Sequence, residues 1–351
     1  MSISIHEIAK LSGVSTATVS RVINGSSRVS PATAAKVQAM IQQLNFVPDN
    51  RAIHLSRGKS QIYGIIIPDL TNPFFTETVK EFEALLFENE QEMLVANTDF
   101  HGTRLQRSVH RMLLRRVDGV AMLTSELEAA SLESLVQNRI PVVTTDHYRT
   151  GCGISDIAVD FGDGIRQMVD HLRQLGHHNL GFIGGTEGLI TSRVRRESFM
   201  DAVVKQGLSS RAGWIGVANF TIESGSEAMA RILAEPEIPT AILCANDLTA
   251  IGALRTAHAK GLDVPGDISI AGCDDIDMAD IVHPPLTTLR ISRREYARLL
   301  YEALRDSGKD LTQPGRQLTL PLSLVVRKST GPAPQHGGGS AEKHASTRTR
   351  K

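Results

Sequence analysis

The chain has few residues that could form disulfides, hold a metal ion or anchor it in a membrane. Its three cysteines, Cys152, Cys244 and Cys273, include no C-x-x-C pair, so neither a disulfide framework nor a zinc knuckle is expected, and we expect buried reduced thiols. No apolar run approaches the roughly eighteen residues that cross a bilayer. The chain also starts without the charged n-region and apolar h-region of an export signal. We therefore expect a cytoplasmic protein with no membrane contact.

The motifs of common enzyme classes are missing as well. The sequence contains no G-x-x-x-x-G-K-[ST], no G-x-G-x-x-G, no G-x-S-x-G and no H-E-x-x-H. We expect no catalytic residues, no cofactor and no metal site. The adjacent His177 and His178 lack a third ligand and are expected to form a solvated helix end.

Charge is distributed unevenly along the chain. The 38 basic and 38 acidic residues cancel, but residues 1–60 carry seven Lys or Arg against Glu7 and Asp49, a surplus of five. Residues 331–351 add a surplus of three, which leaves residues 61–330 with a net charge of minus eight. A small basic head suits DNA phosphates, whereas an acidic body does not. Contact with DNA is therefore predicted for the head.

Residues 4–24 have the spacing of a helix-turn-helix. Ser4 and Glu7 form an S-x-x-E capping box that predicts a first helix, and Gly13 can take the positive φ of the turn that follows. Ser15 is a good N-cap for a second helix whose apolar residues share one face. We expect its polar face to contact base edges through Thr16, Ala17, Thr18, Ser20, Arg21 and Asn24. The alternative is an ordinary helical hairpin in a larger core, which would need no polar face.

A third helix and a short segment complete the head. Ser30 and Pro31 are an N-cap and a first helical residue, and Asn45 can end the helix in a left-handed conformation. The helix-turn-helix domain is predicted to span residues 1–48. Residues 49–60 are predicted to be a short segment and linker with too little apolar surface to be stable alone.

Several runs of the sequence resemble the lactose-repressor (LacI/GalR) family of bacterial transcriptional regulators. They are VSTATVSRVIN, RVSPATAAKV, LNFVPDNRAIHL, CANDLTAIGA and ISIAGCDDI, and the resemblance extends from about Ile3 to Thr330. It implies a hinge helix that is ordered only on DNA, where two copies pack together and a leucine enters the minor groove. Leu55 matches that leucine and Ala52 the small residue at the helix contact. The alternative is that Leu55 is a linker residue shielded by the body.

The body alternates short apolar runs with amphipathic helical patterns. IYGIIIP, EMLVANT, VDGVAML and IPVVTTD are typical of buried parallel strands, and NLGFIGG, PTAILCAN and DISIAGC form a second series. The predicted fold is an all-α helix-turn-helix head followed by an α/β core. That core has two doubly wound parallel-sheet lobes and spans residues 61–330. By the resemblance it is similar to a type I periplasmic binding protein. Residues 331–351 have almost no apolar content, so a disordered tail is expected.

Polar and aromatic residues follow the predicted strands, where ligands bind in open parallel sheets. Carboxylates, amides and an arginine suit the hydroxyls of a sugar, and aromatic rings suit its C–H face. The resemblance implies an effector site, commonly for a sugar or sugar derivative. The expected effector-binding residues are Asn72, Phe74, Phe75, Asp146, Arg195, Phe220, Asn246 and Asp274.

Alternatives remain for these residues and for the chain. Asn246, Asp247 and Asp274 could cap helices, and Phe74 or Phe75 could belong to the core between the lobes. We predict a homodimeric DNA-binding transcriptional regulator, a repressor of palindromic double-stranded operators, controlled by a small carbohydrate-like effector. The tail has no leucine heptads, which favours a dimer over a tetramer. Other possibilities are a helix-turn-helix fused to a sugar-processing enzyme and a free sugar-capture protein.

Overall fold

The computed structural model describes residues 3–46, 59–124 and 129–334. The chain divides into two compact units, residues 1–61 and residues 62–351. We call them the head and the body. Among the described helices, none has the length and apolar character needed to cross a membrane.

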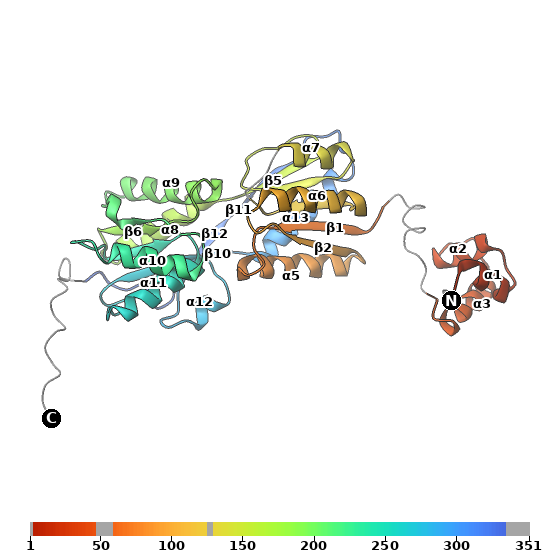
Figure 1. Ribbon diagram of the computed structural model, residues 1–351, viewed down its shortest axis with the longest axis horizontal. Coiled ribbons are helices and arrows are strands. Elements are labelled where there is room, and N and C mark those ends of the chain that lie inside the picture. The colour runs from red at the N-terminus through yellow and green to blue at the C-terminus, as the bar shows by residue number, and fades with distance from the viewer. Residues whose placement is uncertain (1–2, 47–58, 125–128, 335–351) are drawn as a thin grey trace, which may run out of the picture. The chain divides into compact units, whose positions relative to one another are not determined.

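The head is a three-helix unit (Figure 1), with α1 (Ile5–Ser12), α2 (Thr16–Ile23) and α3 (Pro31–Gln43). The capping box forms as expected: the Ser4 side chain accepts from the Glu7 backbone N–H, and the Glu7 side chain accepts from the Ser4 N–H. Gly13 ends α1 at φ 66°, a left-handed conformation that glycine adopts without steric cost. Asn45 ends the third helix region with φ 46°. The head's core contains the fully buried Ile8, Val19 and Val37.

The first lobe of the body is a six-stranded sheet in the order β11-β5-β4-β3-β1-β2, in which every neighbouring pair is parallel. Its helices are α5 (Pro73–Glu88) and α13 (Arg293–Ser307) on one face, and α6 (Gly102–Arg115) and α7 (Ala129–Gln137) on the other. Successive residues of β1 serve the two faces, since Ile65 packs under α5 and Ile66 under α6. The strands are β1 (Ile62–Ile67), β2 (Glu92–Asn97), β3 (Gly119–Met122), β4 (Val142–Thr145), β5 (Ile154–Val159) and β11 (Gln317–Leu320).

The second lobe repeats this architecture with the order β12-β10-β9-β8-β6-β7. Its strands are parallel except that β12 runs antiparallel to β10. The 3₁₀ helix η1 (Ala212–Trp214) precedes β7, and α12 (Met278–Ile281) follows β9. The strands are β6 (Leu180–Ile183), β7 (Ile215–Gly216), β8 (Ala241–Cys244), β9 (Ser269–Asp274), β10 (Thr287–Ile291) and β12 (Leu322–Val325).

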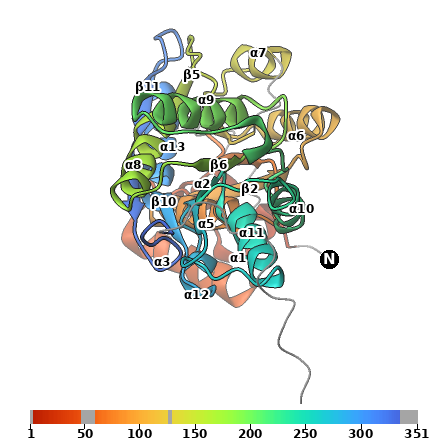
Figure 2. The same ribbon diagram turned by 90° about the vertical axis from the view of Figure 1, so that its left-hand side faces the viewer.

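Four longer helices cover the second sheet. The first pair, α8 (Phe161–Gln174) and α9 (Ile190–Lys205), packs on the opposite face from α10 (Ile222–Ile232) and α11 (Asp247–Ala259). In the two perpendicular views, α9 and α12 lie on opposite sides of this lobe (Figures 1 and 2).

The chain passes between the lobes three times. It leaves the first lobe after β5 to enter α8, returns after β10 to enter α13, and crosses again between β11 and β12. Each crossing is short, because Val159 and Phe161, Ile291 and Arg293, and Leu320 and Leu322 belong to elements of different lobes. These short crossings tie the two lobes into one unit while leaving their strand ends facing each other.

Three sequence expectations need correction. The first residues of the expected tail are part of the body: Gly331 is buried, and the Ala333 N–H donates to the Leu175 carbonyl. Of the expected tail, residues 335–351 lie outside the described chain. His177 is fully buried and bonds Thr240, Ser269 and the Gly331 carbonyl, whereas His178 is exposed. The three cysteines are free as expected, but Cys152 is exposed and only the other two are buried.

Candidate functional site

The polar face of α2 is available for contact in the isolated head. Ala17 and Arg21 are exposed, and the Arg21 side chain makes no hydrogen bond or ion pair with the described residues. Ser15 caps the helix, since its Oγ accepts from the Thr18 N–H at 3.1 Å. Thr18 and Asn24 also have local roles: Thr18 Oγ1 bonds Ser15 Oγ at 2.9 Å, and Asn24 Nδ2 donates to the Ser20 carbonyl at 2.9 Å. Thr16 and Ser20 are half-buried on the same helix.

Two expected DNA-binding residues cannot be placed. Ala52 and Leu55 lie in residues 47–58, outside the described chain. Their roles as helix contact and minor-groove wedge stay predictions.

The body contains a cavity of about 450 Å³ between its lobes, and all eight expected effector-binding residues line it. They come from sequence positions that are up to 202 residues apart, from Asn72 to Asp274. Asn72, Phe74 and Phe75 lie at the start of α5, and Asp146 follows β4. The second lobe supplies Arg195 from α9, Phe220 after β7, Asn246 before α11 and Asp274 at the end of β9. The strand ends of both lobes therefore meet at this cavity.

Arg195 is held inside the cavity between two aromatic rings. Its guanidinium carbon lies 4.3 Å from the centre of the Phe161 ring and 5.4 Å from that of Phe220. Nη1 donates to the Ala245 carbonyl at 2.6 Å, and Nη2 lies 4.0 Å from Asp274 Oδ1. Nε is buried and has no hydrogen-bond partner. Since unpaired buried donors are costly, this edge of the guanidinium is suited to a ligand oxygen.

Asp274 has the complementary feature. Its Oδ1 is buried without a hydrogen-bond partner, and the residue adopts φ 116° at the end of β9. Burial raises the pKa of this carboxyl to about 6, while the nearby Arg195 and Arg293 lower it. The open acceptor of Asp274 and the open donor of Arg195 would bond a ligand hydroxyl from two sides.

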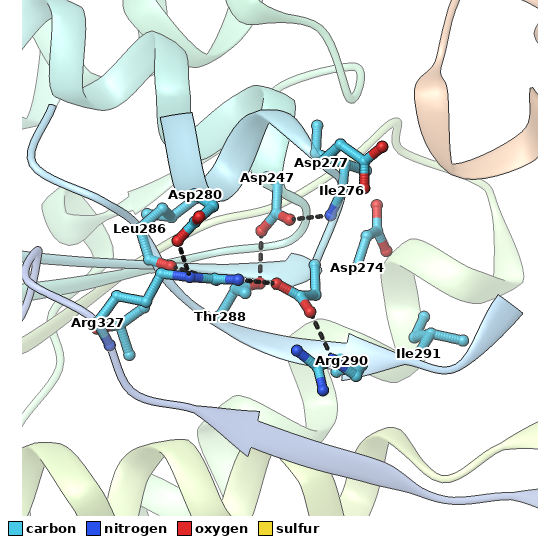
Figure 3. A network of polar contacts seen from close by, with 12 residues as sticks. Asp247, Asp274, Ile276, Asp277, Asp280, Leu286, Thr288, Arg290, Ile291 and Arg327 are labelled. Atoms are coloured by element: carbon cyan, nitrogen blue, oxygen red, sulfur yellow. Dashed lines mark hydrogen bonds and ion pairs between the residues drawn. The ribbon is translucent and has the colours of Figure 1, made fainter. Parts of the chain in front are cut away.

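The neighbouring aspartates are part of the protein's own framework (Figure 3). Asp247 accepts from Thr288 Oγ1 at 2.5 Å and from the Ile276 N–H at 2.9 Å. Asp275 accepts from Arg290 at 2.6 Å and from Arg327 at 2.7 Å. Neither Asp274 nor Asp275 caps a helix, because α12 has no side-chain cap. Of Asp247, Asp274 and Asp275, only Asp274 therefore keeps an oxygen without a hydrogen-bond partner in the described chain.

Asp146 is the second buried carboxylate of the cavity. Its Oδ1 accepts from the N–H of Val159, the last residue of β5 in the same lobe, at 2.7 Å. Burial raises its pKa to about 7, and the Val159 hydrogen bond and Arg195 act in the opposite direction. The residue is 7% exposed. Its second oxygen makes no hydrogen bond with the described chain.

The two asparagines combine capping with a place in the cavity wall. Asn72 Oδ1 accepts from the Phe74 N–H at 3.0 Å and so caps α5. Asn246 Oδ1 accepts from the Thr249 N–H at 3.0 Å, and its Nδ2 donates to the Phe220 carbonyl at 3.1 Å. The capping alternative thus applies to Asn246, whose amide also fixes the Phe220 backbone beside Arg195.

The aromatic side of the cavity contains more residues than the sequence suggested. Phe74 is buried and packs edge-on against Phe75 at 5.2 Å and beside Tyr296 at 6.2 Å. Sequence reasoning did not identify Phe161 or Tyr296. Phe161 directly follows the β5–α8 crossing, and its place at a strand end was the available signal; Tyr296 lies inside an amphipathic helix and gave none. The other unanticipated lining residues include Thr145, Thr186, Thr191, Asn219 and Thr221.

No group of three or more His, Cys, Asp or Glu suited to a metal ion occurs among the described residues. The cavity's chemistry is hydrogen bonding by two carboxylates and one guanidinium, together with aromatic contact. This set suits binding of a polar ring compound.

Comparison with known proteins identifies the family. Residues 4–49 match the model described as bacterial regulatory proteins, lacI family, and residues 169–330 match a periplasmic binding protein-like domain. The chain is 30% identical over 335 residues to the HTH-type transcriptional regulator DegA of Bacillus subtilis (strain 168), covering 95% of this chain and 99% of that one. The chain belongs to the LacI family.

Two further comparisons support the assignment of the chain to the LacI family. It is 33% identical over 323 residues to the ribose operon repressor of Escherichia coli (strain K12), covering 90% of this chain and 96% of that one. A crystal structure of the lac repressor dimer bound to operator and the anti-inducer ONPF matches with a TM-score of 0.84 at 27% identity, covering 94% of this chain and all of that one. The predicted fold and family are confirmed. The protein is a DNA-binding transcriptional regulator, and the enzyme alternative has no support from these relatives.

Proposed function

We propose that the protein is a repressor whose operator binding is controlled by a carbohydrate-like effector in the cavity between the lobes. The observation that carries this proposal is the open pair formed by Asp274 Oδ1 and Arg195 Nε, both buried and both without a hydrogen-bond partner. A sugar hydroxyl donates and accepts at once, so it satisfies both. Aromatic rings beside this pair suit the C–H face of the same sugar.

Coupling between the lobes gives the effector a way to act on DNA. Its contacts come from both lobes, so a bound effector favours the arrangement of lobes in which all contacts are made. In the sequence, the hinge at residues 49–60 leads directly into β1 of the first lobe. A change in lobe arrangement would therefore alter how paired hinges lie on the operator.

For the DNA complex we propose a homodimer that reads a palindromic operator. Arg21 would bond a guanine, with Thr16, Ala17, Thr18, Ser20 and Asn24 on the same helix. Paired Leu55 wedges beside Ala52 contacts would place a flexible pyrimidine–purine step at the operator's centre. The basic surplus of residues 1–60 supports this assignment.

Exposed apolar residues support the dimer. Ile281 of α12 is 81% exposed and Phe87 at the end of α5 is 76% exposed. Val95 on the edge strand β2 is exposed to solvent. The edges of sheets are ordinarily protected, for example by a covering helix or loop. Leu114 and Val204 are exposed to a similar extent, so the similar lac repressor dimer supports a homodimer more directly than these side chains do. We also propose a cytoplasmic location, where operator DNA is accessible.

The test has two stages. A thermal-shift screen of the full-length protein against sugars, sugar acids and purines identifies ligands, because a bound ligand raises the stability of the folded state. Ligands that raise it are then titrated into a complex with operator DNA followed by fluorescence anisotropy. The proposal predicts that a sugar changes operator affinity and is recovered unchanged. A ligand that binds but leaves operator affinity constant, or is converted to product, contradicts it.

A further inference from the structure

The residues lining the cleft are strongly biased in charge. Four of them are aspartates, Asp69, Asp99, Asp146 and Asp274, while Arg195 is the only lysine, arginine or histidine among the described residues of the lining. Asp99 lies at the rim, where it pairs with Arg104 at 3.3 Å and both side chains are about half exposed. Asp146 and Asp274 are buried, so their charges are the least screened in the cleft.

The single cation is already engaged. Arg195 donates to the Ala245 carbonyl and lies beside the Asp274 carboxylate. Its guanidinium carbon also lies over the rings of Phe161 and Phe220. An arginine usually binds a phosphate or carboxylate through two parallel N–H groups. Here Nη1 already bonds a carbonyl, and the remaining Nε–Nη2 edge lies beside Asp274 Oδ1, so an anion bound to that edge would meet a carboxylate of the same charge.

Helix N-termini also face the cleft and would favour an anion, but most are already occupied. Asn72 caps α5, Asp160 caps α8 and Asn246 caps α11 by accepting from first-turn N–H groups. Among the described helices next to the cleft, α6 and α9 start without a side-chain cap. A helix N-terminus is equivalent to roughly half a positive charge, which is too little to offset the buried carboxylates.

We infer that the effector is an uncharged polyhydroxylated molecule, and that Asp146 and Asp274 exclude its phosphorylated and carboxylate forms from the cleft. This inference rests on the proposed function, in which a carbohydrate-like effector occupies the cleft. Asp274 and the free oxygen of Asp146 accept hydroxyl protons, and Arg195 Nε donates to an oxygen. An anionic substituent replaces one of these hydroxyls with a charge of the same sign as both acceptors. Asp146 is then the specificity-determining residue, since it meets no cation as closely as Asp274 meets Arg195.

The test uses full-length protein at pH 8, where the carboxyls are ionised, and isothermal titration calorimetry with matched sets. The sets are ribose and ribose 5-phosphate; glucose, glucose 6-phosphate and gluconate; galactose and galacturonate; cellobiose and cellobionate. Each charged member should bind at least about 100-fold more weakly than its uncharged counterpart, as expected for like charges about 6 Å apart at an effective dielectric of about 20. Each binder is then tested for its effect on operator affinity.

Two variants test whether Asp146 is the residue that excludes anionic ligands. Asp146→Asn keeps an oxygen to accept from the Val159 N–H but loses the charge, and should reduce the ratio of neutral to charged affinity at least about tenfold. Glu187→Gln is the matched control, because Glu187 is exposed on the loop before α9 and does not line the cleft. The ratio of neutral to charged ligand affinity in Glu187→Gln should equal that of the parent protein.

The outcomes are distinct. A charged member that binds as tightly as its neutral counterpart, or an Asp146→Asn protein with the parent's ratio, overturns the inference. If such a charged ligand also shifts operator affinity, regulation by a ligand in the cleft still stands. If no member of any set binds, the proposal of a carbohydrate effector is contradicted, and the inference about anionic ligands is contradicted as well.

Discussion

Arg293 of α13 and Glu77 of α5 form an ion pair of 2.8 Å where the two lobes meet. The same guanidinium donates to the backbone carbonyls of Asp274 and Asp275 at the end of β9, and lies 5.5 Å from the Phe74 ring. Glu77 also accepts from the Asp277 N–H at 3.3 Å. This ion pair therefore connects the backbone of Asp274, the proposed hydrogen-bond acceptor for the effector, to α5 of the first lobe.

This arrangement predicts that Glu77→Gln separates effector binding from response. The effector should bind with similar affinity, because Glu77 does not line the cavity. Its effect on operator affinity should shrink by about 1–3 kcal/mol of coupling free energy, the usual range for communicating sites. Anisotropy measurements of operator affinity, with and without saturating effector, give this coupling directly. Glu83→Gln, an exposed position on the same helix, is the control, and equal coupling in both variants would assign Glu77 to stability alone.

Arg21→Ala should weaken specific operator binding by about 1–3 kcal/mol and relax preference at one base pair in each half-site. The reason is that its guanidinium is exposed without a partner in the described head and can form two hydrogen bonds to a guanine. Selection of binding sites from a random library measures the preference. Lys10→Ala, on α1, should lower affinity for all sequences alike. An unchanged preference in Arg21→Ala would remove the assignment.

Ile281→Asp should dissociate the proposed dimer, because a charge would then have to be buried where an 81% exposed isoleucine would pack. Light scattering after gel filtration should show half the parent's molar mass, with weakened operator binding. Val204→Asp places the same charge at a 73% exposed position on α9, on the opposite side of the lobe from α12 (Figures 1 and 2). That variant should remain dimeric. A dimeric Ile281→Asp protein would show that the interface lies elsewhere.

Effector affinity should fall as the pH drops through about 6. Burial raises the pKa of Asp274 to about 6, with Arg195 and Arg293 opposing the shift and Glu77 adding to it. Asp247, itself buried with a raised pKa, also faces this carboxyl. A hydroxyl that donates to an ionised carboxylate favours the ionised form, so affinity is full near pH 8, starts to fall as Asp146 is protonated near pH 7, and falls further as Asp274 is protonated near pH 6. Calorimetry between pH 5 and pH 8 measures it; an affinity that rises toward pH 5 would contradict the role of Asp274 as acceptor.

Much of this architecture could be predicted because local chemistry decides it. The capping box at Ser4, the N-caps at Ser15 and Ser30 and the left-handed Asn45 all depend on neighbours within a few residues. The apolar runs predicted β1 to β4 and the strands β6, β8 and β9 for the same reason. The eight residues proposed to bind the effector could be brought to one cavity from the sequence because they lie close to strand ends or helix starts.

The remainder depends on distant contacts. β5, β10, β11 and β12 were not predicted, since their pairing partners lie elsewhere in the chain and polar residues interrupt their apolar patterns. The burial of His177 arises from Thr240, Ser269 and the carbonyl of Gly331, which only the fold brings together.

The most direct test of effector control is operator binding by Asp274→Ala, followed by anisotropy while the effector is titrated. Asp274 lies in the body, whereas DNA contacts are assigned to the head and hinge, so operator affinity without effector should match the parent. The effector midpoint should rise by about one to two orders of magnitude, as expected from losing a charge-assisted hydrogen bond of about 1.5–3 kcal/mol. Asp201→Ala, an exposed aspartate of α9 that does not line the cleft, should keep the parent's midpoint. A folded Asp274→Ala protein with an unshifted midpoint would place the effector outside the cleft and contradict the proposed control.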